Sequence, residues 1–193
     1  MNKGTIKTIL VDLDQILVDM VPKWLECYYK TTGERIKEKD ITNFEIRHFV
    51  KYPNVLDALL EKDGFFFNMS PMPNSLKYLK KIKDLEIEII ILTQPPRKAD
   101  YAIKDKRKWM LKYFPWFDAS NMIFAHKKHL IRGDLLFDDN PEHLKKWKAV
   151  NKKSMTATID YPYNRDAKVN LRLTKQNAWK SLYNFLKSNK VDI

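Results

Sequence analysis

Asp12 and Asp14 stand one residue apart at the end of an apolar run, in the stretch LVDLDQILVD at residues 10–19. Two carboxylates at this spacing repel each other and raise each other's pKa unless positive charge lies close to both. The apolar run itself carries no positive charge. The pair therefore predicts a metal ion or a basic side chain that another part of the chain must position.

Two more apolar runs end in polar residues: Thr93 ends the run that starts at residue 87, and Asp138 and Asp139 follow the run at 135–137. Parallel strands bring such residues together, because ligands of open α/β sheets bind outside the carboxyl ends of the strands. Several carboxylates at one place need a cation, and all-oxygen ligation suits Mg²⁺. Lys128, shortly before the aspartate pair, adds a positive side chain. Together these groups predict phosphoryl transfer, with a carboxylate nucleophile and a second carboxylate that moves protons.

Each of these signals is weak alone. A D-x-D pair matches by chance in many chains, and the sequence DDNP at 138–141 is also a good helix start, with Asn140 as N-cap and Pro141 at the first helical position. The coincidence of all of them, each at the end of a predicted strand, favours a site.

The elements that position these residues alternate between strands and helices. Apolar runs typical of buried strands lie at residues 5–11, 87–93, 121–125, 134–138 and 154–159, and helical spacing of apolar residues lies at 22–33, 40–50, 54–62, 75–85, 104–114, 141–150 and 175–187. Strands that are apolar throughout and alternate with helices predict an α/β fold with a parallel sheet covered on both faces. The helical region after the first strand is too long for a simple crossover, so we expect an inserted cap.

The composition fits one packed globular unit with an inserted subdomain. The 193 residues are 44% hydrophobic, no window approaches the roughly 20 apolar residues of a membrane span, and Cys27 is the single cysteine, which is typical of a reducing compartment and favours the cytoplasm. Four glycines form neither a G-x-G-x-x-G motif nor a P-loop. The net charge of +12 favours phosphate-bearing partners, although the lysines are spread along the chain as on an ordinary solvated surface.

The chain resembles a known family at these residues. DLDQILVDM, the strand that ends in Thr93, Lys128 and the pair at 138–139 are similar to the four motifs of the haloacid dehalogenase-like phosphohydrolases. More narrowly, GFFFNMSPMPNSL, ILTQPP, KRKWMLKYF, KKHLIRGDLLFDDNP and YPYN follow the order of the 5'(3')-deoxyribonucleotidases. The resemblance implies a Rossmann-like core at 1–18 and 73–193, with a small helical cap at 19–72. It also implies an Mg²⁺-dependent phosphatase that hydrolyses (deoxy)nucleoside monophosphates.

The resemblance also implies residue roles. Asp12 is the expected nucleophile, which becomes an aspartyl-phosphate, and Asp14 the expected acid and base. The phosphate-binding residues are then Thr93, Lys128 and Lys106, the expected metal ligands are Asp12, Asp14 through its main-chain carbonyl, Asp138 and Asp139, and the aromatic residues expected against the base are Phe65, Phe66 and Phe67. If that segment is extended, its three phenylalanines alternate between faces, so at most two face the site.

The sequence departs from the family at Gln15, where relatives have a small residue, usually glycine, and at Asn140, where some have arginine. A turn that needs unusual backbone angles tolerates glutamine less well than glycine. Asp19 is expected to cap the helix that follows it.

Three alternatives stay open. The same chemistry could act on a sugar phosphate, or on the terminal phosphate of a nucleic acid, which the charge of +12 suggests but which we do not favour. A non-catalytic phosphate-binding or nucleic-acid-binding protein on the same scaffold is the third, and only Gln15 encourages it, because Asp12, Asp14 and Lys128 are all present. The sequence leaves the oligomeric state open, a homodimer included.

Overall fold

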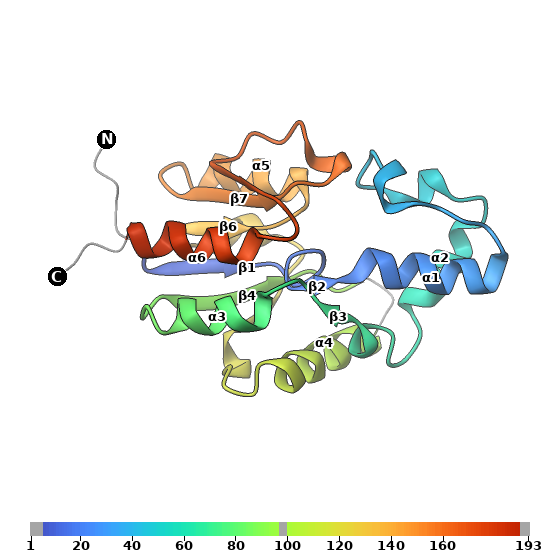
Figure 1. Ribbon diagram of the computed structural model, residues 1–193, viewed down its shortest axis with the longest axis horizontal. Coiled ribbons are helices and arrows are strands. Elements are labelled where there is room, and N and C mark those ends of the chain that lie inside the picture. The colour runs from blue at the N-terminus through green and yellow to red at the C-terminus, as the bar shows by residue number, and fades with distance from the viewer. Residues whose placement is uncertain (1–5, 97–99, 190–193) are drawn as a thin grey trace.

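A six-stranded sheet forms the centre of the computed structural model, which describes residues 6–96 and 100–189 (Figure 1). The strands are β1 (Thr8–Val11), β4 (Glu88–Thr93), β5 (Met122–Phe124), β6 (Leu135–Phe137), β7 (Met155–Ile159) and β8 (Leu171–Leu173). Their order is β5-β4-β1-β6-β7-β8, and every neighbouring pair is parallel. The first strand in sequence therefore lies at the centre, flanked by β4 and β6.

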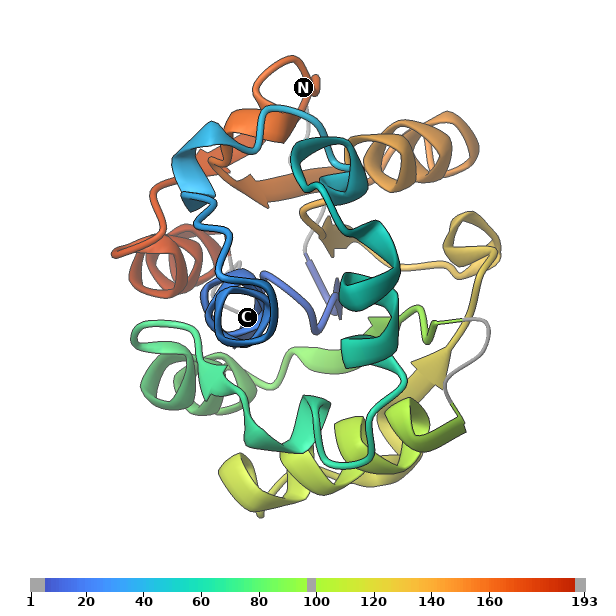
Figure 2. The same cartoon turned by 90° about the vertical axis from the view of Figure 1, so that its right-hand side faces the viewer.

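Helices cover both faces of this sheet, as Figure 2 shows from the end of the strands. Alternate residues of β1 face opposite layers. Leu10 packs with Leu144 and Trp147 of α5 (Pro141–Val150) in one apolar cluster. Ile9 and Val11 belong to the larger cluster, to which the remaining core helices contribute: α3 (Ser75–Lys83), α4 (Asp100–Tyr113) and α6 (Ala178–Ser188). Burial on both faces explains why the strands are apolar throughout, and the predicted α/β class is confirmed.

A helical cap is inserted between β1 and β4 and lies at the right-hand end of Figure 1. It contains α1 (Met20–Thr32), which ends at Gly33 in the left-handed conformation, and α2 (Pro53–Leu60). The two ends of the insertion pair as a short antiparallel ribbon of β2 (Val18–Asp19) and β3 (Ser70–Pro71). The division into a core at 1–18 and 73–193 and a cap at 19–72 stays a prediction, and this ribbon lies at its two boundaries.

The structure differs from the predicted elements in the cap and at the sheet edge. The helix predicted at 40–50 is wrong: the segment holds only a single 3₁₀ turn, Ile46–Phe49, after another at Glu38–Asp40. Neither turn has a side-chain cap. Strand β8 was not predicted, because Arg172 interrupts its apolar run, whereas the equally short β5 and β6 are apolar throughout. No helix in the described part of the chain is long and apolar enough to cross a bilayer.

Candidate active site

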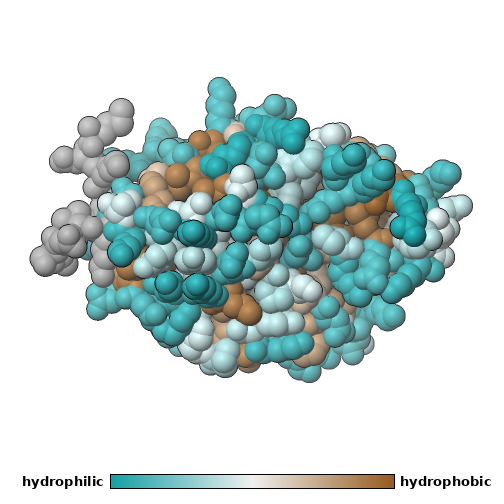
Figure 3. Space-filling view, viewed as in Figure 1, coloured by the Kyte–Doolittle hydropathy of each residue, from teal (hydrophilic) through white to brown (hydrophobic). Residues whose placement is uncertain are grey.

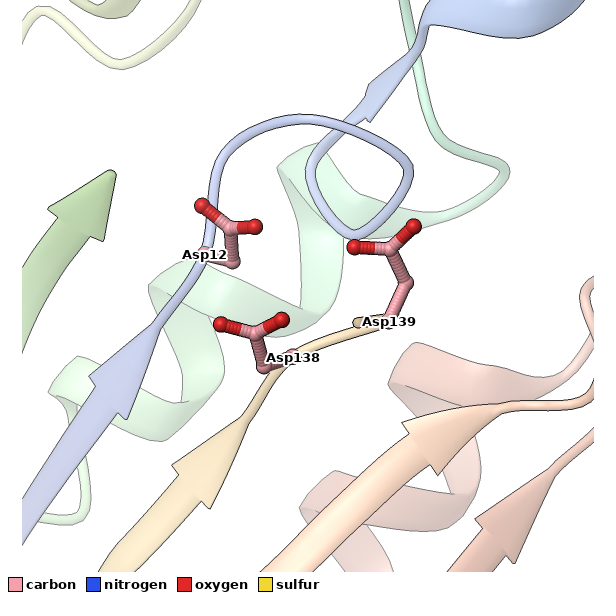
Figure 4. Close-up of side chains that lie close together, drawn as sticks. All are labelled: Asp12, Asp138 and Asp139. Atoms are coloured by element: carbon pink, nitrogen blue, oxygen red, sulfur yellow. The ribbon is translucent and has the colours of Figure 1, made fainter. Parts of the chain in front are cut away.

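Three aspartates converge at the carboxyl end of the sheet. Asp12 follows β1 directly, and Asp138 and Asp139 follow its neighbour β6, so the parallel pairing of the two strands brings the carboxylates together (Figure 4). One carboxylate oxygen from each residue lies within 4.8 Å of the others, and all three residues are buried. The predicted meeting of residues more than 100 positions apart is therefore what the fold produces.

Lys128 supplies the positive charge that the sequence predicted. It begins a short 3₁₀ turn, Lys128–Leu130, after β5, and its side chain is 1% exposed. Its Nζ lies 2.8 Å from Asp12 Oδ1 and 2.7 Å from Asp138 Oδ2. Such short charge-assisted contacts hold the ammonium group between the two carboxylates.

A second lysine organises the other aspartate of the pair. Lys106, buried on α4, donates to Asp14 Oδ2 at 2.6 Å and to Thr93 Oγ1 at 3.0 Å. Asp14 Oδ1 is buried and has no hydrogen-bond partner in the described residues. The carboxylate of Asp14 therefore pairs with Lys106 and lies outside the aspartate cluster. Its main-chain carbonyl stays the group that is expected to ligate a metal.

Burial and neighbouring charges shift the pKa values of the four buried groups in different directions. Burial raises the pKa of Asp12 to about 6 although Lys128 opposes the rise, and the charge of Asp138 adds to it. Burial and the charges of Asp138 and Asp12 also hold the pKa of Asp139 well above its usual range. For Asp138 the cost of burial is outweighed by Lys128, which lowers its pKa. Burial likewise disfavours the charge of Lys128, but Asp12 and Asp138 raise its pKa above the usual value.

A cavity of about 290 Å³ opens above these groups, between the core and the cap. Asp12, Asp14, Lys128 and Asp139 form its polar floor. Side chains of the cap form its apolar wall. They are Met20, Val21 and Trp24, all on α1, and Ile41, Phe44, Ile46 and Leu60 from the rest of the cap. A polar floor beneath an apolar and aromatic wall is typical of a site for a small organic molecule.

Comparison with known proteins gives the family. The profile of a family described as "5' nucleotidase, deoxy (Pyrimidine), cytosolic type C protein" matches residues 5–191. The chain belongs to this deoxyribonucleotidase family. It is 27% identical to a 5'(3')-deoxyribonucleotidase of Bacillus subtilis (strain 168) over 160 residues, which are 83% of this chain and 88% of the relative.

Solved structures agree on the fold. A HAD family hydrolase from Deinococcus radiodurans R1, described with bound phosphate and sodium, superposes with a TM-score of 0.61 at 9% identity, over 98% of this chain and 100% of that one. A hydrolase from Pseudomonas syringae gives a TM-score of 0.57 at 12% identity, over 94% and 98% of the two chains. The fold is that of the HAD-like hydrolases. As a member of the deoxyribonucleotidase family the chain is a phosphatase with a small phosphate-bearing substrate, and the non-catalytic alternative is set aside.

The aspartate cluster of this deoxyribonucleotidase-family chain fits a divalent metal ion. Three carboxylates within 4.8 Å of one another face the single ammonium group of Lys128, so negative charge exceeds positive charge. Burial and this excess of negative charge both raise the pKa of Asp12 and Asp139, and a bound cation would lower the two pKa values again. All-oxygen ligands with room left for water and phosphate suit Mg²⁺.

The three phenylalanines predicted against the base do not line the cavity. The segment is not extended: residues Phe66–Asn68 form a 3₁₀ turn, and Phe65 and Phe66 are buried against each other with ring centroids 5.4 Å apart. Lys106 Nζ lies 4.9 Å from the Phe66 ring, and Lys112 Nζ lies 4.7 Å from the Phe67 ring. Phe66 and Phe67 therefore pack against lysine side chains of α4. Other aromatic residues line the cavity.

Several residues of the site were missed. Trp24 and Phe44 line the cavity from the cap, and Phe44 meets Tyr163 edge to face at 5.7 Å. The Tyr163 hydroxyl donates to Asp139 Oδ2 at 2.7 Å, and His143 Nδ1 lies 3.4 Å from Asp138 Oδ2. The YPYN stretch already carried Tyr163 as part of the resemblance, but nothing in its spacing indicated a contact with an aspartate.

The predicted cap of α1 is wrong, whereas that of α5 is confirmed. Asp19 occupies the N-cap position but makes no side-chain cap bond, and its carboxylate pairs with Lys175 Nζ at 2.8 Å. Asn140 accepts from the main-chain N–H groups of Glu142 and His143, with Pro141 in the first turn.

Proposed function

We propose that this protein is an Mg²⁺-dependent nucleotidase, which hydrolyses (deoxy)nucleoside monophosphates to nucleoside and phosphate through an aspartyl-phosphate. The observation that carries the proposal is the cluster of Asp12, Asp138, Asp139 and Lys128, of which all but Asp138 line the floor of a cavity with an apolar, aromatic wall. The floor suits a phosphoryl group, and the wall suits the flat, apolar faces of a nucleobase.

Asp12 is the nucleophile in this proposal. A carboxylate oxygen of Asp12 attacks phosphorus, the bond from phosphorus to the sugar oxygen breaks, and the electron pair leaves with that oxygen. Asp14 gives the departing oxygen its proton, and the unpartnered Oδ1 is the atom free to hold it, because Oδ2 is bonded to Lys106. The products of the first step are nucleoside and the phosphorylated Asp12.

The second step returns the enzyme to its starting state. Asp14, now ionised, takes a proton from water, whose oxygen attacks the phosphorus of the intermediate. The bond between phosphorus and Asp12 breaks, inorganic phosphate leaves, and both carboxyl groups recover their first protonation states. Lys128, which lines the cavity, would bind phosphoryl oxygens through both steps, together with Lys106 and the Thr93 hydroxyl, which contact each other beside Asp14.

Mg²⁺ would be held by Asp12, Asp138 and Asp139, with the main-chain carbonyl of Asp14, and would supply positive charge at the transferring phosphoryl group. Trp24, Phe44 and Tyr163 would contact the nucleoside. We place the reaction in the cytoplasm, since the sequence has a single cysteine.

The test is phosphate release from a panel of nucleoside monophosphates and sugar phosphates with Mg²⁺, with Asp12→Asn assayed beside the parent protein. We expect turnover of dUMP or dTMP that a chelator abolishes, that Asp12→Asn abolishes, and that leaves a phosphorylated Asp12 when the reaction is quenched with acid. Turnover of sugar phosphates alone would keep the mechanism and refute the substrate.

A second candidate substrate is the terminal phosphate of a nucleic acid, and one observation favours it. Beside the main cavity lies a depression of about 310 Å³ that has no carboxylate in its wall, lined by Gln94, His126, Lys127, Lys128, His129, His143 and Lys146. It shares Gln94, Lys128 and His143 with the cavity and could receive further phosphates of a strand. Faster release from 3'- or 5'-phosphorylated oligonucleotides than from mononucleotides, lost steeply with salt, would support this candidate.

A further inference from the structure

Gln15 occupies a backbone conformation that favours glycine. Its φ is 56°, in the left-handed region. It follows Asp14 directly, in the turn that leaves β1. The residue is 2% exposed. A long side chain in such a conformation is unusual unless the side chain itself makes contacts that the turn or its neighbours need.

The Gln15 side chain bonds to the start of the cap helix. Its Oε1 accepts hydrogen bonds from the main-chain N–H groups of Met20 at 2.8 Å and Val21 at 3.0 Å, the first two residues of α1. The first N–H groups of a helix have no partner within the helix. Because Asp19 makes no cap bond, Gln15 supplies the acceptor that the N-cap residue ordinarily supplies.

The side-chain amide and the main-chain carbonyl of Gln15 contact the cap and the core, respectively. Its Nε2 approaches Glu38 Oε1 at 3.4 Å, and its main-chain carbonyl accepts from the hydroxyl of Tyr161, in the core, at 3.0 Å. Lys175, also in the core, lies 3.0 Å from Glu38 Oε1 and 2.8 Å from Asp19 Oδ1, both in the cap. Gln15 therefore lies inside a polar junction between the catalytic turn, the first turn of α1 and the core.

We propose that Gln15 is a positioning residue, which couples the catalytic turn to α1 and so holds the nucleoside-facing wall in register with the nucleophile. Met20 and Val21, whose amides it binds, line the cavity, and Trp24 lies one turn further along the same helix. Without this acceptor the first turn of α1 frays, and the wall shifts relative to Asp12. This inference rests on the proposed function, because the wall matters only for a substrate that reaches it.

The test compares Gln15→Gly with the parent protein on two substrates, a nucleoside monophosphate and p-nitrophenyl phosphate, whose small ring needs little of the wall. Glycine accepts a positive φ without strain, so this variant should fold. We expect its KM for the nucleotide to rise about tenfold, the change that corresponds to the loss of one helix cap. Because Gln15 also lines the cavity, the comparison is relative: its KM for p-nitrophenyl phosphate should change several-fold less than its KM for the nucleotide.

A direct measurement accompanies the kinetics: hydrogen exchange at the amides of Met20 and Val21 should speed up in Gln15→Gly. Gln15→Glu keeps the acceptor but faces Glu38, and the double substitution Gln15→Glu with Glu38→Gln restores a donor opposite it. We expect the double variant to recover both the exchange protection and the nucleotide KM, because the carboxylate at position 15 accepts from both amides and the exchange conserves the net charge near Lys175.

The outcomes separate this inference from the proposed function. A nucleotide KM that does not change in Gln15→Gly overturns the inference, as does an equal loss on both substrates with a lowered melting temperature, which would make the role merely structural. If the parent protein hydrolyses p-nitrophenyl phosphate but no nucleotide, the proposed function fails. Amide exchange then decides the coupling: unchanged protection overturns it, and lost protection that the double variant restores supports it.

Discussion

At the scale of single residues, Lys128 is enclosed between Asp12 and Asp138 with almost no exposure to solvent. Removal of one partner of a buried ion pair leaves uncompensated charge and costs more than the pair contributes in net stability. The two carboxylates are also crowded by Asp139. Lys128 therefore has a structural role in addition to its proposed contact with phosphate.

We expect Lys128→Met to lower kcat about 100-fold or more and to destabilise the metal-free protein by about 3 kcal/mol. Added Mg²⁺ should recover much of the stability, because it replaces part of the missing positive charge. Urea unfolding with and without Mg²⁺ measures both effects, and Lys145→Met, on an exposed face of α5, is the matched control. Equal stability of the Lys128 variant and the control would contradict this role.

The carboxyl group of Asp12 predicts a pH dependence. Its pKa is raised from 3.8 to about 6 in the folded, metal-free protein, so the folded state binds a proton where the unfolded state has lost it. The contribution of Asp12 to the free energy of unfolding therefore falls as pH rises from about 4 to 6. Asp139, whose pKa is also raised, contributes with the same sign.

We expect the melting temperature of the metal-free protein to fall between pH 5 and pH 7, and the stabilisation by Mg²⁺ to be larger at pH 7, where protons compete less for the carboxylates. Thermal unfolding at both pH values, with Mg²⁺ or chelator, measures this. Asp12→Asn should flatten the metal-free profile. A melting temperature that rises steadily from pH 5 to pH 7 in chelator would show that the cluster does not hold its protons as described.

At the scale of elements, helix α5 begins directly after the aspartate pair, so its cap also fixes the site. Asn140 accepts from the N–H groups of Glu142 and His143, while Asn177, at the corresponding position before α6, makes no side-chain cap bond. We expect Asn140→Ala to lower the free energy of unfolding by about 1 kcal/mol and Asn177→Ala to change it little. Urea titration of the two variants measures the free energy of unfolding. Similar losses of stability in both variants would contradict the role of the Asn140 cap.

The cap presents Phe44 at the mouth of the cavity, 46% exposed and in edge-to-face contact with Tyr163. We expect Phe44→Ala to raise the KM for nucleoside monophosphates about tenfold, since one stacking contact with a base contributes about 1 to 3 kcal/mol. Phe67→Ala should leave this KM within about twofold, because Phe67 does not line the cavity. The reverse ranking in a steady-state assay would restore the base platform expected from the sequence.

Most core elements could be predicted from the sequence, because their strands are uninterrupted apolar runs and their helices are long enough to show a period. Strand β4 and the spacing of Lys106 and Trp109 on α4 are examples. The 40–50 segment could not, since its apolar residues are compatible with a helix, whereas the structure has a 3₁₀ turn there and places Ile41, Phe44 and Ile46 in the cavity wall. Tertiary contacts decide the conformation of such short segments, because their local preferences are weak.

The same holds for the candidate site. Asp12 and the pair at 138–139 follow strands β1 and β6 directly, so their meeting at one edge of the sheet could be predicted from the strand pattern. The contact between Tyr163 and Asp139 and the bonds of Gln15 to α1 depend on how loops return to the site. Loops carry no period in their sequence, and only the folded arrangement shows these contacts.

At the scale of the whole molecule, the net charge is +12, and the face in Figure 3 is mostly hydrophilic with apolar patches between. A positively charged protein attracts a phosphate-bearing substrate over a distance, and salt screens the attraction. We expect kcat/KM for a nucleoside monophosphate to fall several-fold between 50 and 500 mM KCl. Inhibition by the uncharged nucleoside should change little, and a parallel decline of both would point to a general effect of salt on the cap.

The ribbon of β2 and β3 places the two ends of the cap beside each other, with Val18 opposite Pro71. The core therefore meets the insertion as a closed loop, whatever lies between residues 20 and 69. Closing a longer loop costs only about 0.6 kcal/mol for each doubling of its length. Segments of the cap can be lengthened, shortened or exchanged over evolutionary time while the strand ends that hold the aspartates stay as they are, so substrate preference and chemistry can diverge separately.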